Sequence, residues 1–251
     1  MTGRMKMTGV AAAAALLLGA APAGRGDAWT GSFALRLELA STTRIPLLGG
    51  QRSVTTSLLL VDVERAGGGW TQRHRVCDVR VTGSSLARMT VPAAFVRGLP
   101  VRRYPAVLRE AEGAVRYTAD MGVEAIGYDP VVTRGALPSR AADPGVRDPD
   151  GDGRPGATVE LRVPAARARL FIVQRSHLVL SGREVSPDRI EGGVRVLAHE
   201  QRTLGAEPGF FARTPVIRPD PGRSGFVLAR APGVRSCQDL VRAAPGLFPG
   251  R

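Results

Sequence analysis

Three aspartates alternate with other residues along one short segment, at Asp148, Asp150 and Asp152, and Gly153 follows directly. Ca²⁺ binds roughly six to eight oxygen ligands, and alternate carboxylates of a tight loop point into one concavity. The glycine permits the sharp turn that such a loop makes, and the next residue, Arg154, offers its backbone carbonyl as a further ligand. The spacing therefore predicts a loop that binds calcium in a structural role.

The segment resembles the calcium loops of EF-hand proteins and of other extracellular calcium-binding modules over about a dozen residues. It departs from them where Val159 takes the place of the bidentate glutamate. Pro155 and Gly156, followed by a predicted strand, stand where the second helix of an EF-hand would begin. We therefore expect Asp143, Glu160, water or a distant residue to complete the site. The alternative is an acidic turn that binds no metal.

Other motifs with a defined chemistry are absent from the sequence. His74, His177 and His199 lie in three separate predicted strands and lack the HExxH spacing of a zinc protease. The chain also has no GxSxG nucleophile elbow, no GxGxxG segment and no P-loop, which leaves acyl hydrolysis and nucleotide binding unsupported. We expect a non-enzymatic protein. Catalysis by the histidines and carboxylates, brought together in space, is the remaining alternative.

Two cysteines, Cys77 and Cys237, are the only ones in the chain. An even number of cysteines in an exported protein favours a disulfide. This bridge would close a loop of about 160 residues, for which the loop-entropy formula gives about 5 kcal/mol as an upper value. The alternatives are a buried pair of free thiols and a catalytic cysteine, for which no partner motif is present.

The beginning of the chain has the features of an export signal. Arg4 and Lys6 precede an apolar run at residues 10–18, and small residues follow up to Ala23. Residues 1–23 are therefore predicted to be a signal peptide, with cleavage as late as residue 28 as the alternative. No later stretch reaches the roughly 20 apolar residues of a transmembrane helix. The mature protein is expected to be secreted or periplasmic.

The formal net charge of +13 raises the question of an anionic partner. Lys6 is the only lysine, however, and the arginines are scattered along the chain, as is typical of a GC-rich genome. A nucleic-acid interface needs a clustered basic surface, often with interleaved aromatic residues, and the sequence has none. We therefore expect no nucleic-acid partner.

Apolar and polar residues alternate along most of the chain, which is the pattern of half-buried strands. The pattern predicts a mainly β fold with few or short helices, built as a single antiparallel barrel or barrel-like sandwich of about ten strands. The barrel, similar to that of lipocalins, is preferred because closure removes exposed edges. One domain is expected at residues 29–240, with the calcium-type loop at 143–160 and a C-terminal tail at 241–251. The clearest predicted strands are residues 33–39, 54–65, 70–82, 115–119, 123–128, 157–163, 167–174, 177–185, 190–202 and 226–230.

Over most of its length, the chain resembles a group of secreted proteins of GC-rich bacteria such as myxobacteria. The features that carry the resemblance are the opening at residues 29–31, a DxDGDGxPG loop at 148–156, and a hairpin at 173–182. The group has no assigned activity, so the resemblance implies a compartment and an architecture only.

These observations predict an exported, calcium-stabilised barrel that binds an apolar or amphipathic ligand in its mouth. The alternative is a surface-associated interaction protein that binds anionic envelope polymers through its scattered arginines. The sequence does not indicate an oligomeric state.

Overall fold

The computed structural model describes residues 28–45, 49–66, 69–83 and 86–249. The predicted signal peptide lies outside these residues, as do the glycines at 67–68 and the last two residues of the chain.

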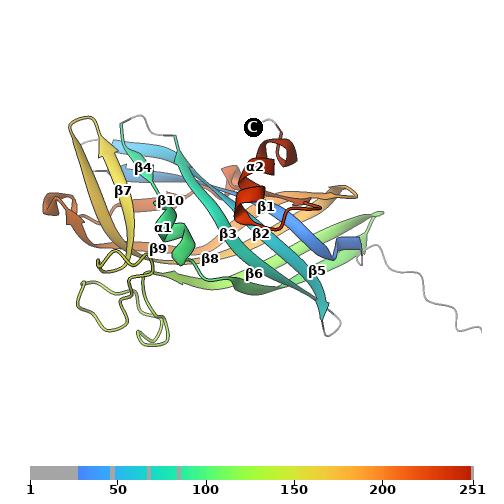
Figure 1. Ribbon diagram of the computed structural model, residues 1–251, viewed down its shortest axis with the longest axis horizontal. Helices are drawn as coiled ribbons and strands as arrows, with labels where there is room; N and C mark the ends of the chain where they lie inside the picture. Colours follow the sequence, from blue (N-terminus) through green and yellow to red (C-terminus); the bar gives the residue numbers. More distant parts are fainter. Residues whose placement is uncertain (1–27, 46–48, 67–68, 84–85, 250–251) are drawn as a thin grey trace, which may run out of the picture.

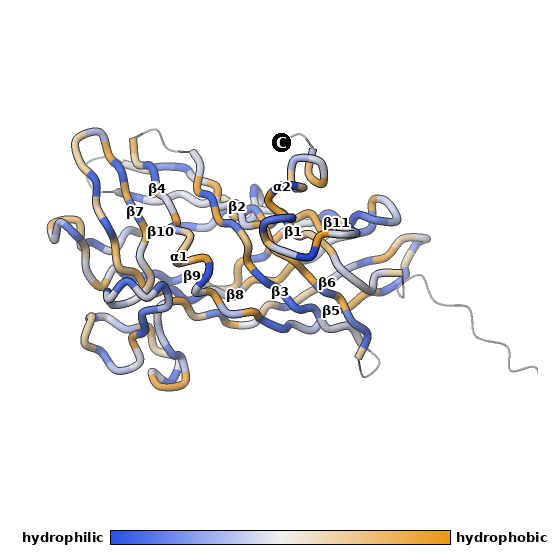
Figure 2. The backbone as a smooth tube through the Cα atoms, viewed as in Figure 1, coloured by the Kyte–Doolittle hydropathy of each residue, from blue (hydrophilic) through white to orange (hydrophobic). Residues whose placement is uncertain are grey.

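Apolar and polar residues alternate along many of the strands (Figure 2), and in β5 and β6 the alternation gives one buried face. The described residues form eleven strands, several of them longer than the sequence pattern predicted. Their bounds are β1 (Gly31–Ile45), β2 (Gly49–Ala66), β3 (Gly69–Thr82), β4 (Arg88–Thr90), β5 (Arg102–Ala111), β6 (Ala114–Ile126), β7 (Ala157–Val163), β8 (Ala166–Ser186), β9 (Arg189–Glu207), β10 (Val216–Pro219) and β11 (Gly225–Arg230).

Eight of these strands close into a ring (Figure 1). Their order is β8-β6-β5-β3-β2-β1-β11-β9, and β9 pairs with β8 to complete the circuit. Every pairing in the ring is antiparallel. The predicted mainly β, antiparallel barrel is confirmed.

The longest strands carry additional partners beyond the ring. Strand β8 pairs with β6 over residues 174–183 and with β7 over residues 166–172, and β7 in turn pairs with β4. Strand β1 pairs with β11 over residues 33–38 and with β10 over residues 41–44. The ring is therefore extended at one end by β4, β7 and β10, and this end surrounds the cavity described below.

The strands predicted at residues 54–65 and 70–82 pair with each other as a hairpin, whereas the hairpin expected at residues 173–182 is wrong. Strands β2 and β3 pair from Ala66 opposite Gly69 to Val54 opposite Thr82, which spans the whole of β3. The hairpin at residues 173–182 does not form, because β8 continues through it. Gly182 is needed there for close packing and not for a turn, since a side chain at this position would meet strand β9 and Phe226.

Two helices accompany the barrel. Helix α1 (Ala93–Gly98) contacts β3 and β7. Helix α2 (Cys237–Leu247) begins at a capping box formed by Ser236 and Asp239, and it takes up much of the segment that the sequence pattern assigned to a tail. The disulfide between Cys77 and Cys237, also predicted, ties the start of α2 to β3 on the outside of the barrel.

The core has an inner and an outer part. Inward-facing residues fill the barrel at the end opposite the cavity, where the Tyr117 and Phe226 rings lie 5.5 Å apart. On the outside, Leu240 and Phe248 pack with Ala34 and other outward-facing residues of β1, β2 and β11. A third cluster joins α1 to β7 and β8.

Candidate functional site

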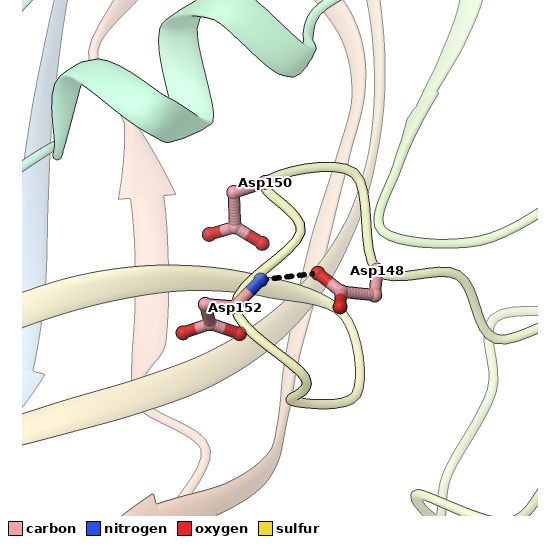
Figure 3. Close-up of side chains that lie close together, drawn as sticks. All are labelled: Asp148, Asp150 and Asp152. Atoms are coloured by element: carbon pink, nitrogen blue, oxygen red, sulfur yellow. Dashed lines mark hydrogen bonds between the residues drawn. The ribbon is translucent and has the colours of Figure 1, made fainter.

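The acidic loop lies between β6 and β7, and its three aspartates converge (Figure 3). Asp148, Asp150 and Asp152 each offer one carboxylate oxygen, and these oxygens all lie within 4.8 Å of one another. Ca²⁺ holds its ligands at about 2.3–2.6 Å, so two oxygens on one ion are at most about 5 Å apart. The loop could therefore hold a metal ion through all three side chains.

Hydrogen bonds within the loop fix these carboxylates. Asp148 accepts from the backbone N–H of Gly153 (2.8 Å), and Asp152 accepts from the Thr158 hydroxyl (2.8 Å). Asp150 accepts from the backbone N–H of Thr158 through Oδ2 (2.9 Å). Its buried Oδ1 has no hydrogen-bond partner among the described residues. This oxygen is the atom in the loop that a cation would satisfy most directly.

Charge repulsion acts within the triad. Burial raises the pKa of Asp150, and the carboxylates of Asp148 and Asp152 raise it further. Burial also opposes ionisation of Asp148, but backbone N–H groups, first that of Gly153, outweigh it and lower its pKa. A divalent cation among the three oxygens would remove this repulsion.

The backbone of the loop depends on glycine. Gly151 and Gly153 have φ angles of 67° and 78°, in the left-handed region that glycine enters without steric cost. Arg154 follows, donates its N–H to Asp152 (2.9 Å), and pairs through its side chain with Glu207 (2.5 Å).

The two acids expected to complete the site lie apart from the triad. Asp143 accepts from the backbone N–H groups of Ser139 (2.8 Å) and Arg140 (3.0 Å), and these bonds lower its pKa to about 2. Glu160 is an exposed residue of β7, opposite Arg169 of β8. Among the described residues, the cluster of candidate metal ligands contains neither of them.

The acidic loop also contacts helix α1. A side chain at Gly98 would meet the carbonyl oxygen of Pro149 at 1.9 Å, so the end of the helix lies directly against the loop. Phe95, on the same helix, lines the barrel cavity. The loop and the cavity thus share one element.

The cavity occupies about 270 Å³ inside the extended end of the barrel. This is just below the range of about 300–1,000 Å³ that is common for small-molecule sites. Side chains from both the ring strands and the extension line it, and most of them are apolar. The apolar wall includes Leu37, Leu59, Phe95, Met121, Ile172 and Val196.

Polar groups gather where the cavity meets the packed core. His74 and Tyr104 line the cavity, with ring centroids 4.9 Å apart, and the Tyr104 hydroxyl donates to Glu124, which also lines it. His74 Nε2 bonds to Gln72 Oε1 (2.8 Å), and the Tyr117 hydroxyl donates to the same oxygen (2.9 Å). We call His74, Gln72 and Tyr117 the polar floor.

Burial disfavours the charged forms of these ring side chains. It lowers the pKa of His74 to about 4 and raises that of Tyr117. Burial, and then the charge of Glu124, raise the pKa of Tyr104. His199 also lines the cavity, and burial lowers its pKa.

The polar floor was not predicted from the sequence, although the residue pattern of β3 indicates polar groups on its inward face. Gln72, His74 and Val76 share one face of a period-two strand, and a polar pair on that face can point inward only if other groups satisfy it. The third histidine, His177, lies on the opposite face of β8 from Leu178 and bonds to Asp120 (2.7 Å).

No protein-family model, curated protein or solved structure matches the chain, so the interpretation of these sites rests on their geometry. Among the described residues, no helix combines the length and apolar character needed to cross a bilayer.

Proposed function

We propose that this protein is an exported barrel that binds a small apolar or amphipathic molecule, and that Ca²⁺ stabilises its acidic loop. The observation that carries the proposal is a cavity of about 270 Å³ inside the closed ring of strands. An apolar wall with polar groups at one end is typical of sites that bury and orient an amphipathic molecule.

Export is supported by two independent features. The Cys77–Cys237 disulfide is typical of an oxidising compartment outside the cytoplasm. The basic and apolar residues before Ala23 fit a signal peptide that directs the chain there.

The arginines favour ligand binding in the barrel over the binding of anionic polymers. Several of them pair with acidic neighbours on the surface, which offsets their charge. Examples are Arg73 with Asp62 (2.7 Å), Arg147 with Asp129 (3.0 Å), Arg175 with Glu200 (2.5 Å) and Arg230 with Asp188 (2.7 Å).

Uptake of the neutral fluorescent probe N-phenyl-1-naphthylamine tests the proposed cavity. The probe should bind saturably at one site per chain, and its fluorescence should increase when it moves from water into the cavity. Val196→Trp, which places an indole in the cavity, should remove the signal, whereas Leu197→Trp should not, because Leu197 is 50% exposed on the outer face of the same strand. Equal uptake by the two variants would contradict binding inside the barrel.

Ca²⁺ is favoured over other ions by the all-oxygen ligand set of the triad and by the glycines of the loop. The proposed role is structural, because Asp150 and Asp152 bond to Thr158 at the start of β7. The ion would thus fix the entry into β7 and the contact of the loop with α1.

Thermal unfolding with Ca²⁺ or with EDTA tests this role. Free Ca²⁺ at about 100 times its Kd should stabilise the fold by about 3 kcal/mol, which raises the Tm by about 5–10 °C for a domain of this size. Asp150→Asn should abolish the rise. Asp143→Asn should keep it, because the Asp143 carboxylate bonds within its own turn. A rise that persists in Asp150→Asn would exclude the triad as the site.

A further inference from the structure

Three exposed arginines lie side by side at the ends of β4, β7 and β8. Arg88 is directly opposite Arg162, and Arg162 is directly opposite Arg167. They face outward, because Met89 and Val159, on the other face of these strands, line the cavity. None of the three pairs with an acidic side chain among the described residues. Like charges directly opposite each other are destabilising, and a negatively charged partner would remove this repulsion.

The acidic residues nearest to this row do not neutralise it. Glu207 pairs with Arg154 and Arg169. Glu160 lies farther from the strand ends, directly opposite Arg169. The ends of the three strands therefore keep a positive charge.

A second group of arginines borders the same end of the barrel. Arg52 of β2 and Arg218 of β10 lie on either side of Thr42 of β1, and each is directly opposite it. Arg44 follows on the same face of β1, and this face points outward because the alternate residues line the cavity. We use the name basic rim for the six exposed arginines Arg44, Arg52, Arg88, Arg162, Arg167 and Arg218.

The opposite end of the barrel has a comparable row that includes acidic residues. Arg109 of β5, Arg116 of β6 and Arg183 of β8 lie directly opposite one another in turn. Arg116 pairs with Glu112, and Glu191 of β9 is directly opposite Arg183. Of the two rows, the one without an acidic member lies at the end that surrounds the cavity.

Exposed apolar residues accompany the basic rim. Leu86, two residues before β4, is 45% exposed, and Val216, the first residue of β10, is 55% exposed. Pro164 and Ala165, both exposed, form the turn from β7 to β8. Apolar side chains beside basic ones are typical of segments that bind at the surface of an anionic membrane. A soluble anionic polymer offers little apolar surface for such aliphatic side chains.

We propose that the extended end of the barrel, where Figure 1 shows β4, β7 and β10, docks on an anionic membrane surface. The guanidinium groups of the basic rim bind lipid phosphates, which match them in geometry as well as in charge. Leu86, Pro164 and Val216 enter the interface between headgroups and acyl chains. Docking brings the apolar cavity to the membrane, where an apolar ligand is concentrated. It goes beyond the proposed ligand binding and does not depend on it.

Sedimentation with vesicles tests the docking. The protein should sediment with vesicles of equal parts phosphatidylglycerol and phosphatidylcholine, but not with vesicles of phosphatidylcholine alone, which carry no net charge. Binding should weaken as the ionic strength rises, because salt screens exposed charges. Equal binding to the two kinds of vesicle, or binding to neither, would overturn the proposal.

Paired variants locate the contact. Arg162→Gln together with Arg167→Gln should lower the affinity for the mixed vesicles by at least about tenfold, since two charges near the anionic surface are lost. Arg109→Gln together with Arg116→Gln is a matched control, because it changes the net charge equally and also replaces two directly opposite arginines. An equal loss in the two double variants would show that net charge, and not the basic rim, governs the binding.

Tryptophan fluorescence reports which end of the barrel meets the lipid. Ala165→Trp should be quenched by brominated phosphatidylcholine in the mixed vesicles, relative to wild type. Pro187→Trp, at an exposed position between β8 and β9 at the opposite end, should not. Equal quenching of the two variants, or quenching of Pro187→Trp alone, would contradict docking through the extended end.

Dextran sulfate distinguishes a membrane partner from an anionic polymer. Leu86→Ser together with Val216→Ser should weaken binding to the mixed vesicles, because their apolar contacts are lost. Vesicle binding that is unaffected by this change would contradict entry into the interface. Binding to dextran sulfate without binding to the mixed vesicles would assign the basic rim to a polymer and overturn the proposal. Uptake of N-phenyl-1-naphthylamine is measured without vesicles, so failure of the docking and failure of the proposed function are distinguishable.

Discussion

A histidine with 2% of its surface exposed has consequences for the protein's response to pH. Burial disfavours the charged ring of His74 and lowers its pKa from the ordinary value of 6.5 to about 4. Between these pH values, the unfolded chain binds a proton that the native protein does not. Native stability is therefore complete above about pH 6.5 and decreases as the pH falls toward 4.

We predict that His74 accounts for a loss of about 3 kcal/mol of unfolding free energy between pH 6.5 and 4. Urea unfolding of wild type and His74→Phe across this range measures this loss. The unfolding free energy of wild type, relative to that of His74→Phe, should decrease by this amount as the pH falls from 6.5 to 4. Leu59 is a buried residue of the same cavity wall and has no titratable group. The unfolding free energy of Leu59→Ala should therefore differ from that of wild type by the same amount at every pH. If the difference in unfolding free energy between His74→Phe and wild type is also the same at every pH, the His74 ring of the native protein is protonated without a loss of stability.

The two candidate sites differ in how much of them is visible in the sequence. The acidic triad lies within five consecutive positions, so spacing alone indicated that Asp148, Asp150 and Asp152 could converge. Gln72 and Tyr117 are 45 residues apart and meet only because β3 and β6 both face the barrel interior. No local pattern identifies such partners, because their contact depends on strand order and register.

At the scale of elements, closure of the barrel depends on two facing glycines. Gly182 of β8 pairs with Gly192 of β9, and Phe226 of β11 pairs with Gly192 from the other side. A side chain at Gly192 would meet the carbonyl oxygen of Ser181 at 2.1 Å and the Phe226 ring at 2.7 Å. The ring of Phe226 occupies the space that these glycines leave open.

Gly192→Ala should therefore destabilise the protein by at least about 2 kcal/mol, because the backbone oxygen cannot move without disturbing the ladder between β8 and β9. The adjacent Gly193→Ala is a matched control, since nothing lies within 4 Å of its added carbon. Thermal unfolding of the two variants compares them directly. Equal melting temperatures of the two variants would mean that β8 and β9 can move apart at this point with little loss of free energy.

The period-two pattern predicted most of the strands, but it did not predict where they end, and it missed the short strands β4 and β10. Residues 157–163 were predicted with the bounds of β7, whereas β8 was divided into strands at 167–174 and 177–185, and a turn was expected at Ser181 and Gly182. The pattern does not distinguish a glycine that turns the chain from one that lets strands approach. Helix α2 was missed although Ser236 and Asp239 have capping-box spacing, since the helix is short and follows many strands.

At the scale of the whole molecule, the end of the chain is attached to the outside of the barrel in two ways. The Cys77–Cys237 disulfide joins α2 to β3 across 160 residues of sequence. Leu240, which is fully buried, packs α2 against an apolar outer patch that includes Ala34, Leu58 and Val227. The helix therefore covers a sheet face that would otherwise expose apolar residues to water.

The two attachments contribute by different mechanisms, and this leads to a prediction for the whole fold. The disulfide acts mainly on the unfolded chain, where closing a loop of 160 residues removes conformational entropy worth up to about 5 kcal/mol. Replacing Cys77 and Cys237 together by alanine should lower the unfolding free energy toward this limit, because the apolar contacts of Leu240 persist in the native state. Urea unfolding measures the loss. Wild type with its disulfide reduced should have the same unfolding free energy as the double variant, and a reductant should not change the stability of the double variant. If the unfolding free energy of the double variant lies within about 1 kcal/mol of that of wild type, the unfolded chain gains little conformational entropy when the disulfide is absent. The stability of the barrel would then depend on packing alone.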